Sequence, residues 1–121
     1  MILVDTSVWI DHLHRSVEHL ARLLDRSDVV QHPFIIGELA LGTLRERELV
    51  LGLLQNLPSV TTATHEEVMY LVNHEQLYGR GLSLVDAHLL ASTLLNPGIK
   101  IWTRDKRLRD AAHQFGIAHS E

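Results

Sequence analysis

Very short apolar runs, separated by longer stretches with helical spacing, constrain the fold of this chain more than any other feature. Ile2 to Val4 is one such run, Val29 to Gln31 looks like a second, and Ile99 to Thr103 is another. A short continuous apolar run is typical of a strand that is buried on both faces. Because these runs alternate with helical stretches, the sequence predicts an α/β fold with a mainly parallel sheet.

The stretches between the runs have helical spacing and recognisable starts. Val17, Leu20, Ala21 and Leu24 follow the i, i+3, i+4, i+7 pattern of one helix face. We expect a helix after a cap at Thr6 or Ser7, and a helical pattern over Phe34–Leu57 as two helices joined near Thr43–Glu46, with Pro33 suited to the first turn. Further helices are expected from Thr64 to Gly79, from Ser83 to Leu95, and after Asp105. Ser59–Thr62 and Gly116–Ala118 are expected to add an edge strand or connector and a final strand.

Length and composition restrict the class of protein. The chain has 121 residues, no visible repeat and no linker, so we expect one domain over residues 1–121. The absence of cysteine excludes disulfides and thiolate metal sites, and it fits a reducing compartment such as the cytoplasm. No apolar run approaches the length of a membrane span, and no secretory signal is expected. The net charge of −4 argues against broad nucleic-acid binding, although a local basic patch can coexist with it.

Four acids stand at the ends of the expected elements. Asp5 ends the first strand, and Asp105 lies just past the last clear strand. Glu38 lies in the first turns of the helix after the second strand, and Asp86 lies in the first turn of a later helix. Ligands of open α/β sheets bind outside the carboxyl ends of the strands. We therefore expect all four carboxylates at one edge of the sheet.

The surroundings of these acids separate them from the other 11 acids of the chain. An acid in an apolar context is costly unless it is paired or bound to a metal. Asp86 alone is also explained as a charge favoured by a helix N-terminus, and Asp105 alone as a helix cap. Asp5 and Glu38 have no obvious cation nearby in sequence. The four placements together favour a functional site.

Clustered carboxylates repel one another and therefore need a cation. A set of oxygen ligands suits Mg²⁺ or Mn²⁺. Such a site commonly positions water against a phosphodiester and neutralises the charge of the transition state. A divalent cation would also reverse the local field and let an acidic protein accept RNA or DNA.

Four ordered motifs are similar to those of a known family. They are LVDTSVWID around Asp5, HPFIIGELALG around Glu38, GLSLVDAHLLAS around Asp86 and IWTRDKRL around Asp105. In these segments, which span essentially the whole chain, the protein resembles the PIN-domain ribonucleases, and specifically the VapC-type toxins of toxin–antitoxin pairs. The resemblance implies a PIN-like three-layer α/β/α sandwich with a mainly parallel central sheet.

The same resemblance implies roles for individual residues. Asp5, Glu38, Asp86 and Asp105 occupy the acidic catalytic positions, with Asp5 and Asp86 as the principal metal ligands. Thr6, Ser7 and Thr103 match small hydroxyl positions that orient the carboxylates or a metal-bound water. The implied reaction is Mg²⁺-dependent cleavage of RNA, a transfer or ribosomal RNA, with Mn²⁺ as another possible ion. The implied partners are a VapB-type antitoxin and a second copy of the chain, assembled into a larger complex.

Basic residues and histidines are further candidates for the site. Arg80, Arg104 and Lys106 are the candidates for RNA contacts, since Arg80 precedes Asp86 and the other two flank Asp105. An ordinary solvated helix surface explains such residues equally well. None of the nine histidines makes an HExxH motif, so a histidine metal site is not favoured. His12 could still line the cleft, and His113 and His119 are expected at the surface.

Three other classes of protein compete with the nuclease. A phosphorylation receiver needs an acid at the end of a strand near the middle of the chain, and LLQNLPSVTT offers none. A phosphatase with Asp5 as nucleophile usually has a second acid two residues later, where Ser7 stands. A catalytically silent PIN-like module that binds RNA or protein would lack one or more of the four acids. The nuclease is therefore the favoured hypothesis, with the silent module as the alternative.

Overall fold

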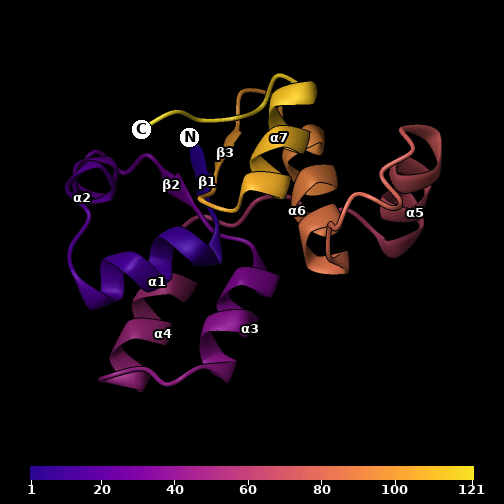
Figure 1. Ribbon diagram of the computed structural model, residues 1–121. Helices are drawn as coiled ribbons and strands as arrows, with labels where there is room; N and C mark the ends of the chain where they lie inside the picture. The colour runs from indigo at the N-terminus through magenta and orange to yellow at the C-terminus, as the bar shows by residue number, and fades with distance from the viewer.

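Three short parallel strands form the centre of the molecule, in a computed structural model that describes residues 1–121 (Figure 1). β1 (Ile2–Val4) lies between β2 (Val29–Val30) and β3 (Lys100–Trp102). Leu3 is paired with Val30 on one side and with Ile101 on the other. Parallel neighbours require crossover connections, which bring helices onto the faces of the sheet. The predicted parallel sheet is therefore confirmed.

Helices cover the sheet on two sides. Figure 1 shows α6 (Leu84–Leu95) and α7 (Lys106–Gln114) on one side of the strands and α1 (Thr6–His14), α3 (Pro33–Leu41) and α4 (Arg47–Gln55) on the other. The remaining helices are α2 (Glu18–Asp25) and α5 (His65–His74), and α5 packs on the outer side of α6. This arrangement agrees with the predicted three-layer α/β/α fold. None of the seven helices has the length and apolar character that crossing a membrane requires.

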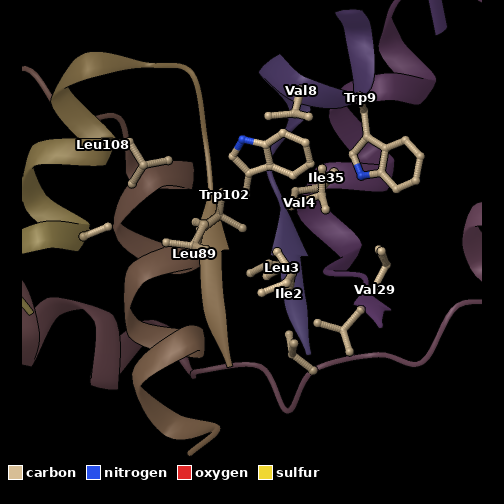
Figure 2. Close-up of a cluster of buried hydrophobic side chains, with 14 of the residues drawn as sticks. Ile2, Leu3, Val4, Val8, Trp9, Val29, Ile35, Leu89, Trp102 and Leu108 are labelled. Carbon is tan, nitrogen blue, oxygen red and sulfur yellow. The ribbon is translucent and has the colours of Figure 1, made fainter. Parts of the chain in front are cut away.

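The buried core lies on both faces of the strands. Figure 2 shows Leu89 and Leu108, from α6 and α7, on one side of β1 and β3, with Val8 and Ile35 on the other. Each of these four side chains is almost completely buried, as the continuous apolar runs predict. Trp9 and Trp102 are also buried, so both tryptophans pack in the core.

Local signals in the sequence set the starts of most helices. Thr64 and Glu67 form a capping box at α5, and Ser83 and Asp86 form another at α6. Pro33 occupies the first turn of α3, as predicted. α3 ends at Leu41 and α4 begins at Arg47, so the expected joint is confirmed.

Some predicted elements are shorter than expected. Ser59–Thr62 and Gly116–Ala118 contribute only isolated bridges, Gln31 to Ser59 and Ile101 to Ala118, because too few residues pair for a strand. α5 ends at His74, before Gly79, and Gln76 then has a φ of 53°. The prediction of a cap at Thr6 or Ser7 was wrong: Asp5 is the residue before α1, and its side chain makes no capping bond.

Candidate active site

The parallel pairing of β1 and β3 brings two of the predicted acids to one edge of the sheet. Val4 is paired with Trp102, and the backbone N–H of Asp5 donates to the Trp102 carbonyl at 2.9 Å. Each strand ends there, and the chain continues into Asp5 on one side and into Thr103, Arg104 and Asp105 on the other. The carboxyl ends of neighbouring strands thus supply the first part of the site, as the topology requires.

A network of small hydroxyl groups fixes the carboxylate of Asp5, which is only 6% exposed. Its Oδ2 accepts hydrogen bonds from Ser7 Oγ at 2.9 Å and from Thr103 Oγ1 at 2.7 Å. Those hydroxyls accept in turn from the backbone N–H groups of Arg104, at 3.0 Å, and Asp105, at 3.1 Å. Each hydroxyl both donates and accepts, so the Asp5 side chain is held in one orientation. Ser7 and Thr103 thus both contact the carboxylate of Asp5.

Glu38 reaches the same region from α3. Its Oε1 accepts a hydrogen bond from Thr6 Oγ1 at 2.7 Å, and Thr6 is the residue that follows Asp5. α1 and α3 pack against each other, which brings these side chains together. Thr6 therefore contacts Glu38, while Ser7 and Thr103 contact Asp5.

Asp86 lies in the same electrostatic field as two of the other acids. Its Oδ2 accepts from the backbone N–H of Ser83 at 3.0 Å as part of the capping box. Burial raises the pKa of the Asp86 carboxyl, and the bonds to Ser83 oppose this. The negative charges of Asp5 and Asp105 raise the pKa further. A carboxyl group whose charged form is destabilised by two neighbouring carboxylates is typical of a functional site.

Asp105 combines a structural role with its place near the other acids. Its Oδ1 accepts from the backbone N–H of Leu108 at 3.0 Å and so caps the start of α7. The explanation as a helix cap is therefore correct for this residue. Its charge also acts on Asp86, so the cap belongs to the acidic group as well.

Comparison with known proteins agrees with this geometry. The family model for the PIN domain matches residues 2–114 of the chain. The chain belongs to the PIN-domain family. Over 121 residues it is 50% identical to Ribonuclease VapC32 from two strains of Mycobacterium tuberculosis, CDC 1551 / Oshkosh and ATCC 25618 / H37Rv. The alignments cover 100% of this chain and 98% of each relative. This PIN-domain protein is therefore of the VapC ribonuclease type.

The carboxylates of this PIN-domain protein share one property that bears on metal binding. In Asp5, Glu38, Asp86 and Asp105, one oxygen accepts a hydrogen bond from the chain. The second oxygen makes no hydrogen bond to the protein in any of them. Glu38 and Asp105 are exposed residues, and the second oxygens of Asp5 and Asp86 are not among the buried unpaired atoms. The chain thus orients each acid and leaves one oxygen available as a ligand.

The spacing of the four acids decides whether they can bind one metal ion together. As the side chains stand, no three histidine, cysteine or acidic side chains gather closely enough to hold a metal ion. The effect of Asp5 and Asp105 on the pKa of Asp86 nevertheless shows that these carboxylates share one field. Like charges oppose a closer approach until a cation neutralises them. The all-oxygen donor set fits a hard divalent cation, and ligation requires the carboxylates to approach one another.

Glu38 also lines a groove between α1, α3 and α4. The groove has a volume of about 730 Å³, and Ile10, Leu13, Leu39 and Val50 are among its apolar residues. A smaller cavity of about 370 Å³ lies between α5 and α6, and none of the four acids lines it. The larger groove is therefore the one that adjoins the acidic site of this PIN-domain protein.

The basic residues considered for RNA binding are already paired within the chain. Arg104 contacts Asp11 at 2.7 Å and Glu121 at 2.9 Å, and these two acids were not identified from the sequence because nothing local marks them as partners. Arg80 donates to Gln114 at 2.7 Å, and Lys106 lies 3.2 Å from Asp110. Exposed pairs of this kind are weak, so Arg80 and Lys106 can exchange them for phosphate. Arg104 has two acidic partners and is the least available of the three.

The positions of His12, His113 and His119 agree only in part with those expected from the sequence. His12 does not offer its Nδ1 to a cleft, because that atom accepts from the backbone N–H of Val17 at 3.0 Å. His113 is exposed, as predicted. The prediction for His119 was wrong, because its ring is half-buried, with its Nε2 2.8 Å from that of His19.

Proposed function

We propose that this protein is the toxin of a VapBC-type toxin–antitoxin pair and that it hydrolyses RNA with the help of a divalent metal ion. The observation that carries the proposal is the arrangement of the four acids, each held by one oxygen while the other makes no hydrogen bond to the chain. The full-length similarity to Ribonuclease VapC32 supports the same activity. The unit that carries it is a single domain over residues 1–121.

The ion is Mg²⁺ in this proposal, with Mn²⁺ as a substitute. Asp5 and Asp86 are the principal ligands, and Glu38 and Asp105 complete or tune the site. The ion would supply neutralisation of the phosphodiester charge and a more acidic bound water. Its oxygen-only ligand set is the one that hard divalent cations prefer.

The chain's own contribution is orientation of the acids. Ser7 and Thr103 hold one oxygen of Asp5, and the other oxygen makes no hydrogen bond to the chain. Thr6 does the same for Glu38, and the backbone N–H of Ser83 does so for Asp86. Ligands whose orientation is fixed in advance need less reorganisation, and what remains is the approach of the carboxylates to the ion. Cleavage by water would leave a 3′-hydroxyl and a 5′-phosphate.

The substrate of the proposed toxin is a transfer RNA or a ribosomal RNA, and its location is the cytoplasm. The proposed partners are a VapB-type antitoxin and a second copy of the chain, which together form a larger complex. The groove beside Glu38, in which five of the 11 lining residues are hydrophobic, supports antitoxin binding, because a peptide lying in it would contact Glu38. Arg80 and Lys106 are proposed to contact RNA phosphates at the rim. Arg104 would do so only after leaving Asp11 and Glu121.

Substitution of single acids tests the proposal. Asp5→Asn and Asp86→Asn should each abolish the Mg²⁺-dependent cleavage of cellular RNA by the purified protein, while circular dichroism shows that both variants remain folded. Glu66→Gln is the matched control, since Glu66 is an exposed acid on α5 and should leave the rate unchanged. Mapping of new 5′-phosphate ends identifies the RNA that is cut. Undiminished cleavage in Asp5→Asn, or RNA binding by wild type with no cleavage at all, would favour the silent PIN-like module instead.

A further inference from the structure

A row of aromatic rings lies on helices that also carry Glu38 and Asp86, and it has no part in the proposed hydrolysis. The centroids of His32 and Phe34 are 5.2 Å apart, and those of Phe34 and His88 are 4.7 Å apart. His65 extends the row, at 6.0 Å from His88 and nearly parallel to it, with an angle of 24° between the ring planes. The row therefore crosses three helices: it starts at α3, includes α6 and ends at the first residue of α5.

The rings of His32 and His88 both pack against Phe34. His32 is buried, its Nδ1 accepts from the backbone N–H of Phe34 at 3.0 Å, and its Nε2 lies 3.2 Å from Ser92 Oγ. His88 is buried as well. Phe34 itself is 41% exposed, although it is a large apolar residue. Phe34 therefore contacts two buried histidine rings and still exposes a large part of its side chain to solvent.

The helices that carry this pair also carry two of the acids. Phe34 and Glu38 are four residues apart on α3 and so lie on the same face of that helix, about 6 Å apart along its axis. α6 carries His88 two residues after Asp86, so these two side chains point to different sides of that helix. The Phe34–His88 contact thus spans the same two helices, α3 and α6, from which Glu38 and Asp86 project.

We propose that Phe34, supported by His32 and His88, is a subsite on which one unpaired base of the RNA stacks while a neighbouring phosphodiester lies at the acids. This inference rests on the proposed function and adds a base-binding subsite to it. Proteins that read single-stranded RNA stack exposed bases on phenylalanine, tyrosine, tryptophan or histidine rings. The subsite needs no positive charge, which suits a chain whose net charge is −4. His65, which is exposed, would lie at the edge of the stacked base.

The size of the effect follows from the energy of base stacking. Removing one aromatic ring from such a contact costs about 1–3 kcal/mol, which corresponds to a roughly 5- to 150-fold weaker binding. Because the ring holds substrate and transition state alike, the loss should appear in KM and leave kcat unchanged. A residue that only supports the fold would lower both the melting temperature and kcat.

The test compares two RNA probes on a common background. Fluorescent oligo(A) of about eight nucleotides and an abasic oligomer of the same length are titrated into the Asp5→Asn variant with Mg²⁺ present. Adding Phe34→Leu should weaken binding of oligo(A) at least fivefold and leave binding of the abasic oligomer unchanged. Phe34→Trp should restore the affinity for oligo(A). Tyr70→Leu is the matched control, since Tyr70 is an exposed ring on α5 that stacks on His74 and should not affect either probe.

Several results would overturn the inference. Unchanged oligo(A) binding by Phe34→Leu, an equal loss on both oligomers, or equal parental affinity for both oligomers would each show that no base stacks on Phe34. A loss of antitoxin binding in Phe34→Leu, with RNA binding intact, would instead assign the ring to a protein partner. Failure of the proposed function gives a different result, namely undiminished RNA cleavage by Asp5→Asn. Failure of the subsite alone leaves the loss of cleavage in Asp5→Asn unchanged.

Discussion

Mild acid should destabilise the protein through one buried histidine, His32. Its Nδ1 caps α3 as a hydrogen-bond acceptor, so the ring must be unprotonated at that atom. Its Nε2 lies 3.2 Å from Ser92 Oγ, and that hydroxyl accepts from the backbone N–H of Ala63 at 3.0 Å. Burial lowers the pKa of His32 to about 4, and the positive charge of His88 adds to this. A protonated His32 would lose the capping bond and would be a buried charge without a counter-ion.

The magnitude follows from the difference between the folded and unfolded pKa values. In the unfolded chain the pKa returns to 6.5, so between 6.5 and about 4 only the unfolded state binds the proton. The stability from this group is present above 6.5 and is lost as the pH falls toward 4. The free energy of unfolding should decrease by about 0.2 kcal/mol at pH 7 and by about 2 kcal/mol at pH 5, relative to high pH.

Urea unfolding of the wild type and of His32→Asn measures this effect. Asparagine is a good helix cap that does not titrate, so the variant keeps an acceptor for the backbone N–H of Phe34. The other eight histidines are unchanged, so they contribute to both proteins. The wild type should lose about 2 kcal/mol more than the variant between pH 7 and pH 5. An equal loss in both proteins would refute the assignment to His32.

Three further predictions concern the acids and the core. Mg²⁺ at about ten times its Kd should raise the melting temperature by roughly 5 °C, and Asp5→Asn should weaken that rise. A melting temperature that does not change with Mg²⁺ would count against a cation site. Without metal, Asp86→Asn should increase the free energy of unfolding by roughly 0.5–1 kcal/mol, because it removes repulsion by Asp5 and Asp105. A lower free energy of unfolding, measured with urea, would contradict this. Leu89→Ala should cost about 2–5 kcal/mol in the same assay, since Leu89 is fully buried; a loss below 1 kcal/mol would mean that the core closes around the cavity.

Much of the fold could be predicted because its signals are local. The run of Ile2, Leu3 and Val4 predicts a strand buried on both faces, and all three residues are buried in the structure. The capping boxes at Thr64 and Ser83 depend only on residues three positions apart. Such features form wherever the local sequence allows, so the pattern alone identifies them.

The elements that were predicted wrongly depend on distant contacts. Whether Gly116–Ala118 forms a strand depends on how many of its residues pair with β3, and only Ala118 does so, with Ile101. The N-cap of α1 was misplaced for the same reason. Ser7, a good capping residue, donates to Asp5 and accepts from Arg104, which lies 97 positions away. Sequence spacing carries no information on such a partner.

For the candidate site, the sequence indicated the acids but not their partners. Parallel strands that end shortly before Asp5 and Asp105 bring these residues to one edge, so topology predicts their proximity. The pairing of Arg104 with Asp11 and Glu121 has no such rule, because it depends on where the end of the chain lies. The position of His32 under Phe34 was likewise missed, since a histidine before a proline does not by itself indicate a buried cap.

The structural and functional explanations of the acids support each other. A helix cap uses one carboxylate oxygen and fixes the side chain, which is what a metal ligand also requires before it binds. Asp86 and Asp105 each give one oxygen to a helix N-terminus, while Asp5 and Glu38 each give one oxygen to neighbouring hydroxyls. The positive end of a helix dipole partly offsets the repulsion among the acids in the absence of a cation. The caps therefore let the folded chain carry this concentration of negative charge while the second oxygen of each acid remains available.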